Sequence, residues 1–211
     1  MKQNTFSKSL YYPNAYMFIL FKALENIIDR PGLVKLLNDS GLIYYTTTGA
    51  LEKLNNLEKK FDFRDICAVC ATLNKLHGET IAHRAGREAV KIGIQQFSGL
   101  AFVCKSIYRI LPRRAKLHTA LKFAARVINR TSDQECRVYQ SGDKFTWLIH
   151  ECPFCLGRSE TAPACSIFVG ILAGYAQWAL DGSEVFVQEK SCKALGHDVC
   201  EFSIQESAAT F

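Results

Sequence analysis

The sequence lacks a long apolar run, although 48% of its 211 residues are hydrophobic. The apolar stretch at residues 16–21 is too short for a signal peptide, and no small-residue cleavage pattern follows it. The longest later stretch, residues 166–180, contains Gln177, so it predicts a buried helix and not a membrane span. We therefore expect a cytoplasmic protein that folds around a sizeable core.

The motifs of common catalytic and nucleotide-binding sites are also absent. The chain has no Gly-x-Gly-x-x-Gly fingerprint for a dinucleotide, no Walker sequence for a nucleoside triphosphate and no cluster of carboxylates. It also lacks a persuasive Ser-His-Asp arrangement and a helix-turn-helix tail. We therefore expect a binding protein without catalytic residues.

Cysteine, by contrast, is abundant. The chain has nine cysteines, an odd number that argues against a closed disulfide framework. Without a secretion signal, they are expected to serve in a reducing compartment as core residues, metal ligands or redox groups.

The net charge of +6 is concentrated in residues 105–130. A solvated helix face is the simplest interpretation of this basic segment. An anionic membrane surface, an acidic protein and nucleic acid are the alternatives. Of these we retain peripheral membrane contact and expect no nucleic-acid partner.

Helices are predicted first and hairpins later. The predicted helices cover residues 14–31, 33–41, 50–111, 112–129 and 165–180, and the predicted hairpins cover residues 135–151 and 184–204. Within the long helical region, four glycines predict breaks or close helix contacts: Gly78, Gly86, Gly93 and Gly99. This order predicts an α+β fold in which an antiparallel sheet of two hairpins carries a helical layer.

The second predicted hairpin has the composition of a metal site. Glu189, Cys192 and Cys200 lie close together in the sequence, and zinc favours thiolate and carboxylate ligands, usually four in a structural site. Cys165 is one source of the fourth ligand, since it begins a helix whose N-terminus favours a thiolate.

A second source is the turn Cys152-Pro153-Phe154-Cys155. Its two thiols would join Cys192 and Cys200 as an all-thiolate set of four. The same turn could instead be a redox pair, although it lacks the strand-helix setting of thioredoxin. The simplest alternative to any metal is that these cysteines are small buried core residues.

Residues 152–204 resemble the C-terminal half of the 4-vinyl-reductase domain family. The shared pattern is a Cys before a glycine-containing helix, a strand ending in Glu-x-x-Cys, an Ala-x-Gly turn and Cys-x-Phe. The upstream segments "HRAGREAVKIG" and "YYPNAYMFILFKALENIIDRPGLVKLLNDSGL" also look like standalone members of photosynthetic bacteria and cyanobacteria. The resemblance therefore covers most of the chain.

The resemblance implies a structural zinc with three Cys ligands and one Glu, at Cys165, Glu189, Cys192 and Cys200. It implies a fold similar to TRAPP vesicle-tethering subunits and to the sensor domains of phenol-responsive activators, and these commonly dimerise, so we expect a homodimer. Residues 1–211 would form a single domain of this family, with a helical N-terminal part over residues 1–60 and a core over residues 61–211.

Analogy with the sensory members also gives four candidate ligand-binding residues: His118, Trp147, Val169 and Val187. Trp147 could equally be a core residue and His118 a solvated one. For a tetrapyrrole ligand, a His could bind the central metal and Arg could pair with propionates. Candidates for these roles are His77, His83, Arg84 and Arg87.

The leading functional hypothesis is non-catalytic binding of a hydrophobic small molecule, a chlorophyll-pathway tetrapyrrole, in support of pigment supply or photosystem assembly. Its partners would be pigment-synthesis or photosystem-assembly proteins, in the cytoplasm or at the periphery of the thylakoid membrane. One alternative is a cytoplasmic sensor of small aromatic or lipid-like ligands that acts through a partner protein. Another is a tetrapyrrole vinyl reductase, which would need an external source of electrons.

Overall fold

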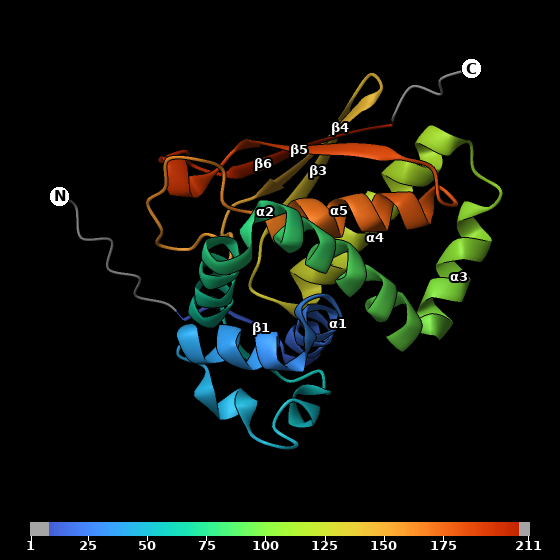
Figure 1. The fold of residues 1–211 in the computed structure, drawn as a ribbon. Coiled ribbons are helices and arrows are strands. Elements are labelled where there is room, and N and C mark those ends of the chain that lie inside the picture. The colour runs from blue at the N-terminus through green and yellow to red at the C-terminus, as the bar shows by residue number, and fades with distance from the viewer. Residues whose placement is uncertain (1–8, 207–211) are drawn as a thin grey trace.

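The computed structural model describes residues 9–206, which form a mainly helical N-terminal part followed by a sheet (Figure 1). The elements are β1 (Tyr11–Pro13), α1 (Asn14–Asp39), β2 (Lys59–Asp62), α2 (Phe63–Gln96), α3 (Ser98–Tyr108), α4 (Arg113–Thr131), β3 (Cys136–Ser141), β4 (Lys144–Ile149), α5 (Ser166–Ala179), β5 (Val185–Ser191) and β6 (Cys200–Glu206). Short 3-10 helices lie at Ile43–Thr46, Glu52–Leu54 and Lys193–Leu195.

The two hairpins form one antiparallel sheet with the strand order β3-β4-β6-β5. Alternate residues of each strand face the helices, as the two-residue period of a strand requires. One row across the sheet aligns Val138, Trp147, Phe202 and Glu189. This register carries Glu189 to the covered face of the sheet, although it lies on an edge strand.

The helices form more than the single layer expected from the sequence. Helix α4 packs on β3, and α5 packs on β5 and β6. Helix α2 packs mainly on α5, and α1 packs on α2, so α1 lies farthest from the sheet (Figure 1). The expectation of one helical layer was therefore wrong, because the long N-terminal helices bury their apolar faces against α5 and against each other.

Glycines explain how closely α2 approaches α5. A Cβ atom at Gly86 would lie 2.1 Å from the carbonyl oxygen of Ile167, and one at Gly170 would lie 2.1 Å from that of His83. Both distances are far below any real contact, so the two backbones touch only because neither residue has a side chain. This crossing fixes the first half of α5, and with it the position of Cys165.

The N-terminal part differs from the sequence prediction in two places. Residues 59–62 form β2, which pairs with β1, where a continuous helix was expected. Asp62 then caps α2 by accepting a hydrogen bond from the backbone N–H of Arg64. Gly78 breaks α2 with φ at 77°, as predicted. No helix within residues 9–206 combines the length and the apolar character needed to cross a bilayer.

Candidate functional site

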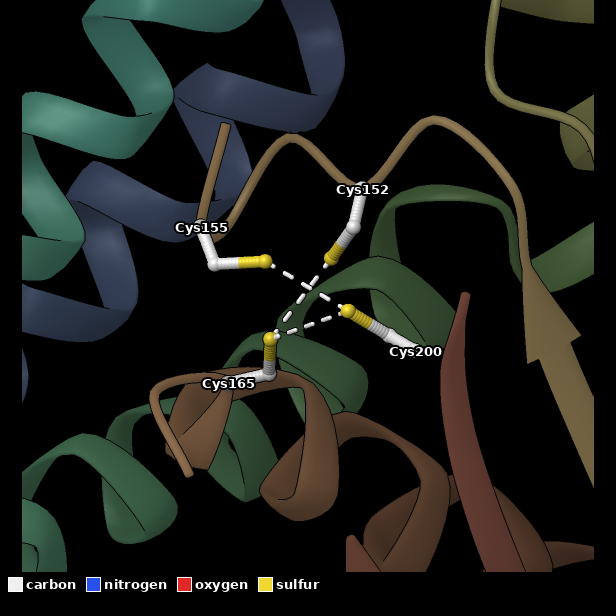
Figure 2. A group of neighbouring side chains, drawn as sticks. All are labelled: Cys152, Cys155, Cys165 and Cys200. Atoms are coloured by element: carbon white, nitrogen blue, oxygen red, sulfur yellow. Dashed lines mark hydrogen bonds between the residues drawn. The ribbon is translucent and has the colours of Figure 1, made fainter. Parts of the chain in front are cut away.

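Five cysteines converge beside the N-terminus of α5. Cys152 and Cys155 come from the loop after β4, Cys165 immediately precedes α5, Cys192 follows β5 and Cys200 begins β6. All five side chains are buried, with 1% or less of each residue exposed. Figure 2 shows four of them pointing toward one another from three separate parts of the chain.

The spacing of the sulfur atoms suits a metal ion. The Sγ atoms of Cys152 and Cys165 are 3.6 Å apart, and those of Cys155 and Cys200 are 3.4 Å apart. The Sγ atom of Cys165 is 3.9 Å from those of both Cys192 and Cys200. Tetrahedral zinc with Zn–S bonds of about 2.3 Å requires sulfur separations of about 3.8 Å. The thiols are therefore already near the positions of zinc ligands.

Glu189 completes the cluster with a carboxylate. Its Oε2 atom accepts a hydrogen bond from the backbone N–H of Cys165 at 2.9 Å, whereas its Oε1 atom is buried without a hydrogen-bond partner. Burial raises the pKa of this carboxyl from its ordinary value. An unpartnered buried oxygen is costly, and a metal ion would relieve that cost.

The thiols strongly influence one another. Hydrogen bonding from Cys152 and the neighbouring thiols lowers the pKa of Cys155, whereas burial is the largest cause that raises the pKa of Cys152. The backbone N–H of Lys193 also donates to the Sγ atom of Cys200 at 3.3 Å. Hydrogen bonds of these kinds stabilise thiolates, the form in which cysteine binds metals.

Two overlapping groups of four residues meet the spacing requirement, and within each group all ligand atoms lie within 4.8 Å of one another. One is the predicted set Cys165, Glu189, Cys192 and Cys200, and the other is Cys152, Cys155, Cys165 and Cys200. The sequence had joined Cys152 and Cys155 to Cys192 and Cys200. It missed that both groups share Cys165, because pairing within the CPFC turn gives no signal of its distant partners.

The four predicted ligand-binding residues lie where the sheet meets α4 and α5. Trp147 is a core residue, 1% exposed, with its ring centroid 5.8 Å from that of Phe168. His118 is partly exposed on α4, and its ring centroid lies 5.9 Å from that of Phe145. Burial, followed by the charge of Lys122, lowers the pKa of His118. Val169 and Val187 are half-buried against the main core, one on α5 and the other on β5.

A groove of about 740 Å³ lies elsewhere, between α2, α3 and the C-terminal end of α5. Its lining residues are Arg87, Val90, Lys91, Ile94, Lys105, Gly174, Gln177, Trp178, Asp181 and Gly182. The wall thus combines apolar surface with three cationic side chains. Because these residues come from three distant segments, no local pattern in the sequence indicated the groove.

Polar contacts shape one wall of this groove. The Nζ atom of Lys105 lies 5.2 Å above the Trp178 ring and 2.5 Å from Oδ1 of Asp181. Arg87 reaches Gln177 at 3.5 Å, and its Nε atom is buried without a hydrogen-bond partner. A charged donor in this state is suited to an anionic ligand.

Arg87 is the one tetrapyrrole candidate on α2 that lines the groove. His77 and Arg84 are exposed on the same helix. His83 is half-buried, and burial, followed by the charge of Arg87, lowers its pKa.

The fold is similar to that of H-NOX domains of known structure. An oxygen-binding H-NOX domain related to soluble guanylate cyclases is 13% identical, with a TM-score of 0.56 over 94% of this chain and 97% of that one. An H-NOX protein from S. oneidensis is 11% identical, with a TM-score of 0.53 over 90% and 99% of the two chains. A structure used to probe heme distortion in the H-NOX family is 12% identical, with a TM-score of 0.57 over 94% and 97%.

These similarities overturn one expectation from the sequence. The predicted likeness to TRAPP subunits and to the sensor domains of phenol-responsive activators is wrong, since the fold is found in H-NOX domains. At identities this low, the likeness establishes the fold alone. The stack of α1 and α2 on α5 is the part that the predicted single helical layer had left out.

No curated protein matches the chain. Residues 146–206, however, match the model of the 4-vinyl-reductase domain, and this segment contains the five clustered cysteines and Glu189. The resemblance to this family is therefore confirmed, and residues 146–206 are a 4-vinyl-reductase domain.

Proposed function

We propose that the protein is a non-catalytic binding module for a hydrophobic small molecule with acidic groups, a tetrapyrrole of the chlorophyll pathway. The observation that carries this proposal is the groove between α2, α3 and α5. Its volume of about 740 Å³ lies within the range of small-molecule sites, roughly 300–1,000 Å³. Val90, Ile94 and Trp178 offer apolar surface to a flat ring system. Three cations stand ready to pair with its carboxylates.

Two comparisons support this class of ligand. The domain at residues 146–206 belongs to a family that the sequence resemblance links to tetrapyrrole chemistry. The H-NOX structures include one used to study heme distortion, and heme is itself a tetrapyrrole. A role in pigment supply or photosystem assembly, with partners in those pathways at the thylakoid periphery, is our extension of the family resemblance.

Titration with chlorophyllide, protoporphyrin and heme tests the proposal. We expect a shift in the absorption spectrum of at least one tetrapyrrole and quenching of the Trp178 fluorescence. The double variant Arg87→Gln/Lys91→Gln should weaken binding by roughly tenfold, since each lost ion pair is worth up to about 1 kcal/mol. The matched control is Arg126→Gln, an exposed α4 cation outside the groove lining, which should bind like the wild type. No spectral change with any of the three pigments would refute the tetrapyrrole assignment.

The cysteine cluster is proposed as a structural zinc site, with Cys165, Glu189, Cys192 and Cys200 as the ligands. The sulfur spacing and the unpartnered Oε1 atom of Glu189 support this choice. Four protein ligands leave no open position on the ion, so its role would be to hold β5 and β6 against α5. Purified protein should contain zinc, and Cys192→Ser should lower both the zinc content and the melting temperature. Wild-type protein without metal and with unchanged stability would contradict this assignment.

A sensor of small aromatic or lipid-like molecules is the second candidate. One specific observation favours it: α3, which supplies Lys105 to the groove, leads an exposed apolar stripe made of Leu100, Phe102, Val103, Ile107 and Ile110. A partner on this stripe would be close enough to respond to groove occupancy. Stabilisation by phenols or fatty acids, together with no response to tetrapyrroles, would favour the sensor. The predicted homodimer is tested by light scattering in the same samples.

A further inference from the structure

The cysteine cluster contains more donors than one tetrahedral ion can use. Five thiols and the Glu189 carboxylate make six, arranged as two groups of four that share Cys165 and Cys200. Cys152 and Cys155 remain on one side of the shared pair, and Glu189 and Cys192 on the other. The donors thus divide into three pairs.

A single ion would leave one of these pairs without a role. If it took the group with Glu189, the buried thiols of Cys152 and Cys155 would remain 3.6 and 3.4 Å from the ligand sulfurs of Cys165 and Cys200. If it took the all-thiolate group, the Oε1 atom of Glu189 would stay buried without a partner. Either choice leaves polar groups in a site that water does not reach, which is costly.

Two ions use every donor. Two tetrahedra that share an edge need two bridging ligands and two terminal ligands for each ion, which is the observed division. The shared edge, from Sγ of Cys165 to Sγ of Cys200, measures 3.9 Å, close to the roughly 3.8 Å edge of a tetrahedral zinc-thiolate site. A thiolate sulfur has enough lone pairs to bind two ions at once, so the cysteines at the shared edge are chemically suited to bridge.

Charge also favours two ions. As ligands the six donors are all anionic, and a buried cluster of six negative charges is unstable without cations. Two divalent ions cancel four of these charges. The remaining negative charge lies near positive backbone groups, since Cys165 precedes the N-terminus of α5 and Cys200 accepts the N–H of Lys193.

We propose that the cluster holds two zinc ions bridged by the thiolates of Cys165 and Cys200. One ion would have Cys152 and Cys155 as its terminal ligands, and the other would have Glu189 and Cys192. This inference rests on the proposed zinc site and adds a second ion to it. Cys152 and Cys155 thereby become ligands, which the resemblance to the family did not assign.

Metal content tests the proposal directly. Protein purified under reducing conditions with zinc should contain two zinc ions per chain. The double variant Cys152→Ser/Cys155→Ser should contain one, because the group with Glu189 remains whole. One zinc in the wild type, or equal contents in the two proteins, overturns the bridged pair but keeps the structural zinc. No zinc in the wild type overturns both proposals.

Cobalt substitution gives a readout that does not depend on a variant folding. Cobalt(II) added to metal-free protein should first give the magnetic resonance signal of an isolated high-spin ion. As the second equivalent binds, this signal should fall, because ions that share thiolate bridges couple magnetically. A signal that rises in proportion to cobalt up to two equivalents, or that saturates at one, contradicts the bridges.

Discussion

The two ends of α5 are built in opposite ways. At its N-terminus, five cysteines and a carboxylate are packed within bonding range and shielded from water. At its C-terminus, the groove is open and lined by long side chains from α2 and α3 as well as α5. The closed end comes from a single segment, residues 152–200, whereas the open end comes from parts of the chain that are far apart in sequence. A fixed ligand set suits an ion of defined geometry, and an open wall suits a larger and more variable ligand.

Metal removal should separate the two ends most strongly. A structural zinc can contribute roughly 10–16 kcal/mol to folding in small domains, so a strong chelator should lower the stability of this protein by on the order of 5 kcal/mol or more. Thermal unfolding with and without chelator measures the change, and chelator saturated with zinc is the control. An unchanged melting temperature after complete metal loss would place the stability of the closed end in its apolar packing.

The two tryptophans report on the two ends separately. Trp147→Ala should destabilise the protein by about 3–5 kcal/mol, because it empties a fully enclosed core position. Trp178→Ala should cost less, since Trp178 is only partly buried, but it should weaken ligand binding in the groove. Denaturant unfolding and pigment titration of both variants provide the comparison. Weakened binding in the milder variant Trp147→Phe, with an unaffected Trp178→Ala, would move the ligand to the sheet.

The glycine crossing between the two ends should tolerate no side chain. Gly170→Ala should cost about 1–3 kcal/mol or more, because its Cβ would meet the carbonyl oxygen of His83. Gly93→Ala, also on α2, is the matched control. Its Cβ would lie 3.8 Å from Ile19, so the gain in helix propensity should leave it neutral or stabilising by up to about 1 kcal/mol. Equal stabilities of the two variants would mean that the helices can separate freely.

The smallest effect is expected at the open end, at Asp181. Lys105 and Lys116 lie 2.5 and 2.7 Å from its carboxylate and lower its pKa to about 2. Because the folded pKa lies below the ordinary 3.8, the stabilisation is present above about pH 4 and is lost as the pH falls toward 2.

Since Asp181 is largely exposed, Asp181→Asn should cost less than about 1 kcal/mol at neutral pH. The difference from the wild type should disappear near pH 2. Unfolding curves at pH 7, 4 and 2 check both points. A difference that grows on acidification would contradict the assigned cause.

The sequence predicted the closed end better than the open one for a physical reason. The Gly142 turn, where φ is 61°, and the spacing of Glu189, Cys192 and Cys200 are local signals, and that spacing lies within the matched segment, residues 146–206. Gly86 was marked as a break or a close contact, but its partner Gly170 could not be read from α2 alone. The groove needed the relative placement of three helices, which depends on that same crossing.

Helix α5 is also a lever. Its fourteen residues span about 21 Å, from the cysteine cluster to the groove wall. At the crossing with α2, backbone meets backbone, so no flexible side chain is available to absorb a displacement. Gly86 and Gly170 therefore act as the fulcrum. A change in the volume of the ion cluster at one end would tilt the helix as a rigid body, and the groove wall at Trp178 would move with it.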